Sequence, residues 1–488
     1  MRGGKVRKAI MINSSHEELR ALHKRLVSRR QFLGQASCAA VSAIPVFNTI
    51  LNLKLAGSVA AAEPGPAEYR ALVCVFLNGG NDSFNMLAPR GNSEYSDYAN
   101  IRQDLALPQN DLLSINPLDY NGPQLGIHPG MPALQQLFEN GNAAFVTNVG
   151  TLVEPVTKAQ YVNGTVPLPL GLFSHSDQIE QWQTSLPDTR SAVGWAGRMA
   201  DLLKSFNSNE KVSMNVSLSG SNVWQSGQSV FEYAITPNGA VGLQGYNADW
   251  QQWQDVIQSR SAAIDSQLGL HYQNLFAQTF AKSKRDAFDA YEVFAAATAP
   301  ELPIGATFPS SNLGQSLRMI ARTIAGRNAL GMTRQTFFVN FGGWDHHDEV
   351  INNQAAMLPV VSQAVGAFFN ALELLGVEDQ VTLFSASDFG RTLTSNGRGS
   401  DHAWGGNQFV VGGAVNGRRI FGTYPSLYEN NPLDVGRGRL IPTLSADEFF
   451  AEMALWLGVS RGNLPLVLPN IGRFYNVDGN DWPVGFLA

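Results

Sequence analysis

Short apolar runs alternate with longer amphipathic segments through most of the chain. The clearest run, Arg70–Leu77, ends in the polar turn Asn78-Gly-Gly-Asn-Asp82. A continuous apolar run that ends in a glycine-rich turn is typical of a parallel strand buried on both faces. Similar runs recur at 143–149, 211–218, 335–341, 380–386 and 408–412. Helical patterns lie between them, at 132–140, 191–205, 247–268, 311–325, 353–375 and 445–458.

This alternation predicts an α/β fold, a doubly wound and mostly parallel sheet with helices on both faces. Two segments are predicted to be irregular. Residues 150–175 form a long loop, and residues 219–245 form a meander of short strands. Because no internal repeat or second boundary is visible, we expect residues 63–488 to form a single domain.

Residues 1–62 differ from the rest of the chain in charge. They carry ten basic and two acidic side chains, whereas residues 63–488 carry 24 basic and 38 acidic ones. Ser28-Arg-Arg-Gln-Phe-Leu33 precedes a weakly apolar stretch, and small residues follow at Val59-Ala-Ala-Ala62. This order is that of a secretory signal, and the adjacent arginines indicate the twin-arginine type. The alternative is a basic helix of a cytosolic protein.

The predicted leader sets expectations for location and partners. We expect the twin-arginine translocase as a partner during export and a periplasmic or extracellular destination. The apolar stretch is too polar for a stable transmembrane span. The net charge of −6 does not suggest binding to nucleic acid. With only Cys38 and Cys74, the chain is neither a disulfide scaffold nor a cysteine-rich zinc module.

Polar residues gather directly after several predicted strands, where open α/β sheets bind ligands. The clusters are Asn78–Ser83, Ser174–Asp177, Gly342–Glu349, Ser387–Arg391 and Asp401–His402. Four of the six histidines after the leader fall in these clusters, each with an aspartate within two positions. A single such pair is more simply a hydrogen-bonded cap, and Ser176 or Asp177 could only begin a helix. The clustering nevertheless favours a metal or catalytic site, since imidazole and carboxylate suit zinc or manganese.

Motifs of other enzyme classes are absent from the sequence. It has no GxGxxG opening a βαβ unit, no P-loop, no GxSxG elbow and no HExxH. Dinucleotide-dependent, nucleotide-hydrolysing, α/β-hydrolase and zincin activities therefore lack support.

The same motifs, in this order, resemble those of the bacterial domain of unknown function 1501 (DUF1501) family. The resemblance runs from Phe76-Leu-Asn-Gly-Gly-Asn-Asp82 to Phe421-Gly-Thr-Tyr-Pro425 and includes the leader and the clusters above. The family is similar to a branch of the alkaline phosphatase and sulfatase superfamily of metal-dependent hydrolases. The resemblance therefore implies an alkaline phosphatase-like fold and a small anionic ester as substrate.

The resemblance also implies a metal site. Asp345, His347 and His402 match the ligands of one superfamily metal. For a second metal, the matching positions carry Asn78 or Asp82, Ser174 or Ser176, Asp388 and Phe389. A phenyl ring has no lone pair to donate, and an amide is a weaker ligand than a carboxylate. We therefore expect one divalent ion rather than two, with zinc first and manganese or calcium as alternatives.

Roles for the remaining residues follow from the resemblance. Ser174 is the first candidate for the nucleophile and Ser176 the second, with His175 as a further catalytic candidate. Arg391 is expected either to bind an anionic substrate oxygen or to form a structural salt bridge. Asp388, Asp82 and His346 are expected to be auxiliary ligands or to orient the ligands, and Asp401 to hold the ring of His402.

These expectations lead to two functional hypotheses. The first is an exported metal-dependent hydrolase of phosphate or sulfate esters that uses a serine nucleophile. The second is a non-catalytic, envelope-associated binding or assembly protein with a degraded metal site. A cofactor-dependent oxidoreductase is suggested only by the export route, and no cofactor fingerprint supports it.

Overall fold

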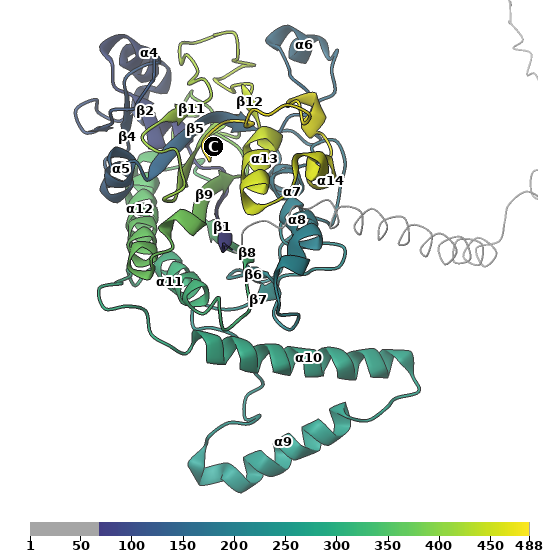
Figure 1. Cartoon of the computed structure of the whole chain (residues 1–488). Helices are drawn as coiled ribbons and strands as arrows, with labels where there is room; N and C mark the ends of the chain where they lie inside the picture. The colour runs from purple at the N-terminus through teal and green to yellow at the C-terminus, as the bar shows by residue number, and fades with distance from the viewer. Residues whose placement is uncertain (1–67, 488) are drawn as a thin grey trace, which may run out of the picture. The chain divides into compact units, whose positions relative to one another are not determined.

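The computed structural model describes residues 68–487, so the predicted leader lies outside the described residues. The body is built on one nine-stranded sheet with the order β11-β5-β10-β9-β1-β8-β6-β7, and β12 pairs with β5 (Figure 1). Its strands are β1 (Arg70–Asn78), β5 (Ala143–Gly150), β6 (Asn215–Ser217), β7 (Tyr233–Ala234), β8 (Arg334–Gly342), β9 (Val381–Ser387), β10 (Gly406–Val411), β11 (Ile420–Phe421) and β12 (Leu444–Ser445). A small antiparallel sheet holds β2 (Leu87–Pro89), β4 (Leu125–Ile127) and β3 (Leu113–Ser114).

Every pairing in the large sheet is parallel except the two made by β10. The predicted doubly wound, mostly parallel α/β fold is therefore confirmed. The connection from β9 to β10 contains no helix. Without a crossover helix the chain turns back at the carboxyl end of β9, so β10 starts at that same edge. This places residues 388–405 beside the carboxyl ends of β1 and β8.

Helices cover both faces of the sheet (Figure 1). On one face lie α5 (Pro132–Glu139), α11 (Asn312–Ala325) and α12 (Val350–Leu375). On the other lie α7 (His175–Thr184), α8 (Trp195–Leu203), α13 (Ala446–Leu457) and α14 (Leu464–Val467). The remaining α-helices within residues 68–487 are α3 (Ser83–Met86), α4 (Asn92–Arg102), α6 (Lys158–Asn163), α9 (Gln254–Leu268) and α10 (Leu275–Thr298).

The irregular segments contain more order than the sequence predicted. Residues 150–175 include α6, which begins with a capping box between Thr157 and Gln160. Residues 219–245 contain one short strand, β7, rather than a meander. The small sheet, α4 and α10 were not predicted at all.

Helix α12 is long and apolar enough to cross a membrane by length and composition alone. Half of its most apolar window is buried within the structure. Leu358, Phe368 and Leu372 are among its buried residues, and the helix packs against α5 and α11. These contacts are those of a core helix.

One glycine fixes the edge of the sheet that carries the polar clusters. Gly79, directly after β1, has a φ of +121°, and a Cβ there would lie 2.5 Å from the backbone nitrogen of Asp345. Only glycine tolerates both the backbone conformation and this close approach. The loop after β1 is thereby held against the loop after β8.

Candidate metal centre

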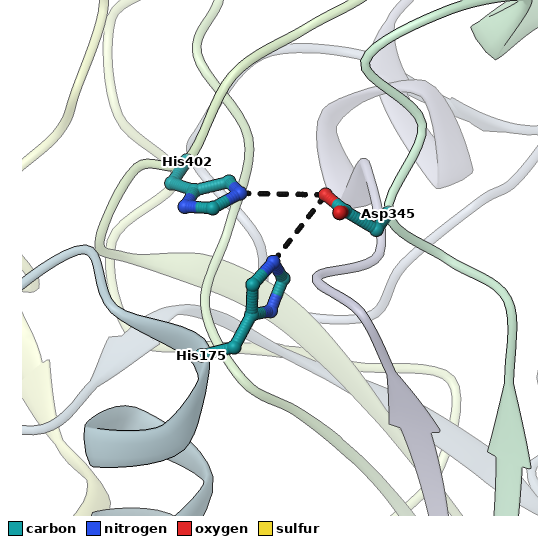
Figure 2. A group of neighbouring side chains, drawn as sticks. All are labelled: His175, Asp345 and His402. Atoms are coloured by element: carbon teal, nitrogen blue, oxygen red, sulfur yellow. Dashed lines mark hydrogen bonds and ion pairs between the residues drawn. The ribbon is translucent and has the colours of Figure 1, made fainter.

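Three side chains from distant parts of the chain meet at the carboxyl edge of the sheet (Figure 2). His175 is the first residue of α7, Asp345 follows β8, and His402 precedes β10. One ligand atom from each lies within 4.8 Å of the other two. The Asp345 Oδ1 atom is 3.4 Å from Nε2 of His175 and 3.3 Å from Nε2 of His402.

His347 adds a fourth group to this cluster. Its Nε2 atom is 3.1 Å from Asp345 Oδ1 and 2.8 Å from Nε2 of His402. In a tetrahedral zinc site with Zn–N bonds of about 2.0–2.1 Å, neighbouring ligand atoms are separated by about 3.3 Å. The separations around Asp345 are therefore close to those that a tetrahedral ion requires.

Hydrogen bonds at the far side of each ring fix its tautomer. The Nδ1–H groups of His175 and His347 donate to Asp388 (2.7 Å) and Asp401 (2.8 Å), and that of His402 donates to the Phe173 carbonyl (2.7 Å). Carboxylates and carbonyls can only accept, so each Nδ1 carries the proton. In the neutral form, a ring with this tautomer presents a lone pair on Nε2. Metal-binding histidines are commonly held in this way.

Two of these Nε2 atoms lie close together. His347 Nε2 and His402 Nε2, 2.8 Å apart, would repel if both rings are neutral. His175 Nε2 is buried and has no hydrogen-bond partner among residues 68–487. A cation at the centre would satisfy all three nitrogens and the Asp345 carboxylate together. The residues present therefore fit a divalent metal ion.

The electrostatics of the cluster keep its carboxylates ionised. Partial burial acts to raise the pKa of Asp345, but the hydrogen bond and charge of Arg391 outweigh it and lower this pKa. Burial also acts against ionisation of Asp401, yet hydrogen bonds from Asn396, His347 and Arg437 lower its pKa to about 2. Both carboxylates stay negative throughout the physiological range.

The imidazole rings respond to different surroundings. The hydrogen bond to Asp388 raises the pKa of His175, whereas desolvation lowers the pKa of His402. His402 therefore favours the neutral form that binds a metal. A metal ion bound at Nε2 of His175 must displace the second proton of the charged ring, while the Nδ1–H stays hydrogen-bonded to Asp388.

Arg391 is the buried support of the cluster. Its guanidinium is fully buried and pairs with Asp345 Oδ1. It also donates to the carbonyls of Gly79, Gly80, Trp344 and Ser400. All three nitrogens are used, so the structure realises the salt-bridge alternative for this residue. Arg391 ties the loops after β1, β8 and β9 to one point.

The carbonyl that holds His402 comes from an unusual backbone conformation. Phe173 has a φ of +73°, which a bulky side chain rarely adopts. The Arg439 guanidinium lies 5.0 Å from the centre of its ring and donates from Nε to the carbonyl of His402. The strained turn thus aims a backbone acceptor at His402. Sequence analysis gave no signal for Phe173 or Arg439 in this role.

Ser174 and Ser176 lie at the amino end of α7, on either side of His175. Ser174 occupies the N-cap position, and its hydroxyl lies 3.1 Å from that of Ser176. Ser176 is exposed to solvent. Both hydroxyls therefore lie beside the cluster and near the positive end of a helix dipole.

Asp388 and Phe389 take different parts in the site. Asp388 is fully buried and accepts from both His175 and the backbone of Gly79. The ring of Phe389 packs against the rings of His175 and His402, with centroids 4.8 and 4.7 Å apart. Phe389 thus forms an apolar wall at the position that the family resemblance matches to a ligand of a second metal.

Two predicted auxiliary residues lie outside the cluster. The fully buried carboxylate of Asp82 pairs with Arg102 at 2.6 Å and accepts from Ser400 at 3.1 Å. His346 is buried beside Trp344, and neither ring nitrogen has a hydrogen-bond partner among the described residues. Neither side chain belongs to the group of converging ligand atoms. Both side chains are instead buried in the protein interior beside the cluster.

The structure thus brings together Asp345, His347 and His402, the set implied by the family resemblance. It adds His175, which was expected to be catalytic rather than ligating. Asp401 holds His347 instead of His402. The hydrogen bond between His175 and Asp388 joins positions 213 residues apart, so local sequence could not indicate it.

Comparison with solved structures finds only distant similarity. Ps i-CgsB is 12% identical with a TM-score of 0.32, covering 80% of this chain and 72% of that chain. The soluble domain of lipooligosaccharide phosphoethanolamine transferase A from Neisseria meningitidis is 9% identical with a TM-score of 0.28, covering 82% and 90%. A mutant of alkaline phosphatase PafA is 13% identical with a TM-score of 0.25, covering 67% and 64%. TM-scores this low do not support any transfer of chemistry from these proteins, so the chemistry of the chain is argued from its own residues.

Comparison with models of protein families identifies the family of this chain. No curated protein matches the sequence. A family model described as "Protein of unknown function (DUF1501)" matches residues 69–460, which include both ends of the sheet and every residue of the cluster. The chain therefore belongs to the DUF1501 family.

Proposed function

We propose that this protein is an exported, divalent-metal-dependent hydrolase of phosphate or sulfate esters. The observation that carries the proposal is the convergence of three imidazole Nε2 atoms on the Asp345 carboxylate, with each Nδ1–H already engaged. Such an arrangement favours a cation among the Nε2 atoms. At a solvent-accessible edge of the sheet, a metal site of this kind is suited to catalysis.

Zinc is the first candidate for the ion, with manganese and calcium as alternatives. Three imidazoles and one carboxylate form a donor set that zinc prefers, whereas calcium prefers oxygen ligands. Asp345, His175, His347 and His402 would hold a single ion. With all four groups bound, the ion would need a fifth coordination position to withdraw electron density from the phosphoryl or sulfuryl group of the substrate.

Ser174 is the proposed nucleophile, and Ser176 is the second candidate. Attack of Ser174 Oγ on phosphorus or sulfur breaks the bond to the ester oxygen and releases the alcohol, which takes up a proton. One water molecule then frees the serine and yields inorganic phosphate or sulfate. The amino end of α7 would stabilise negative charge that develops on Oγ.

The surrounding residues act as positioning groups in this proposal. Asp388 and Asp401 set the tautomers of His175 and His347, and Arg391 fixes the carboxylate of Asp345. Because Arg391 is buried and fully used, it would not contact the substrate. The anionic group of the substrate would approach from the solvent side, where Asp345 and His347 are about half exposed.

The non-catalytic alternative rests on Phe389. Its ring occupies a wall of the site and offers no lone pair, so a second ion would lack a ligand there. A protein with one structural ion could then serve as a binding or assembly component of the envelope. Ester hydrolysis by the metal-loaded protein separates the two alternatives.

The test combines elemental analysis with an activity screen. We expect about one zinc per chain, and hydrolysis of a phosphomonoester, phosphodiester or sulfate ester in zinc-supplemented buffer. His402→Ala removes one imidazole from the cluster and should abolish both the bound metal and the activity. His271→Ala is the matched control, since His271 is exposed in the loop between α9 and α10.

The outcomes distinguish the alternatives. Metal bound in the parent chain and absent from His402→Ala, without hydrolysis of any ester, would favour the binding protein. Full metal content in His402→Ala would show that the cluster is not the metal site.

A further inference from the structure

A cavity beside the cluster lies where α7 faces the carboxyl ends of β1, β6 and β8. Its volume is about 680 Å³, within the usual range of small-molecule sites. Ser176 and Asn78 line it. Ser176 directly follows His175, and Asn78 directly precedes Gly79, whose N–H donates to Asp388. The cavity therefore begins at the edge of the candidate metal centre.

The lining of this cavity carries no free charge. Its charged residues are Glu180 and Arg190, which pair at 3.4 Å, and Arg190 also pairs with Asp177. The single cation is thus neutralised by two carboxylates. A ligand with a second anionic group would find no counter-charge here, and the cost of leaving such a charge unpaired is high.

The polar groups of the lining are amides and hydroxyls with unused hydrogen-bonding capacity. Asn78, Asn340 and Ser221 line the cavity, and their side chains form no hydrogen bond within residues 68–487. Each carboxamide offers two donors and one acceptor, and the hydroxyl offers both functions. Groups that both donate and accept are best matched by ligand hydroxyls, which do the same.

The apolar part of the lining offers no aromatic face. Phe76 and Phe338 contribute to the floor but are almost fully buried. The other apolar residues are aliphatic: Ile179, Ala192 and Val223. An aromatic leaving group or a nucleobase would find no stacking partner in them. Selection between ligands therefore depends on the hydrogen-bonding groups of the lining, while the aliphatic side chains can contact the C–H groups of a ligand.

We propose that this cavity binds the alcohol part of the ester, and that this alcohol is uncharged and polyhydroxylated, as in a saccharide or polyol. The inference rests on the proposed hydrolase function for its role in catalysis. The binding of the alcohol itself does not depend on turnover. Asn340, at the carboxyl end of β8, is the residue expected to select for it.

A binding experiment tests the cavity without any hydrolysis. Saturation-transfer NMR on the zinc-loaded protein would use methyl glucoside, methyl galactoside, N-acetylglucosamine and myo-inositol, with adenine and benzyl alcohol as comparators. We expect transfer to at least one polyhydroxylated probe, and its loss in Asn340→Leu. Asn328→Leu is the control, because Asn328 is exposed and precedes the opposite end of the same strand.

A kinetic experiment tests the link to hydrolysis. Asn340→Leu should lower kcat/KM for glucose 6-phosphate, or glucose 6-sulfate, roughly tenfold more than for the corresponding p-nitrophenyl ester, as expected for one lost hydrogen bond to the leaving group. Asn328→Leu should change neither value, and zinc content should be equal in all three proteins.

The results separate failure of this inference from failure of the proposed function. The absence of binding by every polyhydroxylated probe, whether or not adenine or benzyl alcohol binds, would overturn the inference. Equal losses for both esters in Asn340→Leu would overturn it as well. Polyhydroxylated binding that is lost in Asn340→Leu, together with no ester hydrolysis, would retain the cavity assignment and overturn the hydrolase.

Discussion

At the scale of single residues, Asp388 influences the candidate metal centre without lying among the ligand atoms. It is fully buried, accepts a hydrogen bond from His175 Nδ1 and receives another from the backbone of Gly79. The same carboxylate thus orients one ring and fixes the loop after β1. Residues in this position usually matter for metal affinity almost as much as the ligands do.

Replacing Asp388 by Asn should weaken metal binding without unfolding the protein. The amide keeps the shape of the side chain but loses the charge, so it holds the His175 Nδ1–H less strongly. We expect zinc affinity to fall about 10- to 100-fold, measured by competition with a zinc chelator. Asp348→Asn is the control, since Asp348 is an exposed acid on the same loop as Asp345. Equal zinc affinity in Asp388→Asn and the parent protein would show that Asp388 does not support the metal site.

Residue-level chemistry was visible in the sequence only in part. The Asp-His pairs after predicted strands indicated Asp345, His347 and His402, because carboxyl ends of parallel strands share one edge. The supports of these ligands were not visible. Phe173 contributes a backbone carbonyl, which any residue type could supply, and its selection depends on a left-handed turn.

At the scale of elements, the sequence predicted strands that are buried on both faces and helices that have one clearly apolar face. Strand β1 is buried along almost its whole length, and helix α11 has a strongly one-sided apolar face. Helix α10 escaped prediction because its interior contacts are mainly alanines, Ala281, Ala290 and Ala297, while Phe276 and Phe280 are exposed. Helix prediction depends on apolar residues that recur every three to four positions. Small buried residues and large exposed ones make this periodicity hard to recognise.

Helix α13 carries a buried acid in its first turn, and this acid makes stability depend on pH. Asp447 is fully buried, and burial raises its pKa to about 7, with the charge of Arg198 opposing the shift. In the unfolded chain the group titrates near pH 4. Between these values the unfolded state loses the proton and the folded state keeps it. Stability therefore falls as pH rises from about 4 to about 7.

Asp447→Asn should remove this dependence. Relative to the parent, the variant is expected to be more stable above pH 7, by up to about 4 kcal/mol, and similar near pH 4. Urea unfolding at a series of pH values measures the difference. Asp255→Asn is the control, because Asp255 is an exposed acid in the first turn of α9. A parallel offset at every pH would contradict the assignment to Asp447.

At the scale of the whole molecule, the cluster joins four strand connections that lie far apart in sequence. His175 and His402 are separated by more than two hundred residues, and each depends on loops held by Arg391 and Gly79. The unfolded chain cannot assemble these groups. A metal ion that binds them therefore binds the folded state and stabilises it as a whole.

Zinc is therefore expected to raise the stability of the folded chain. At free zinc about 100 times the dissociation constant, the folded state should gain about 2.7 kcal/mol, reduced by any zinc that histidines of the unfolded chain bind. Calorimetry should show a rise in Tm with zinc that EDTA reverses. The rise should disappear in His402→Ala and persist in His271→Ala. An equal rise in His402→Ala would mean that zinc acts at another site. Loss of one ligand should lower the zinc affinity of the cluster, and a lower affinity gives a smaller rise in Tm at the same zinc concentration.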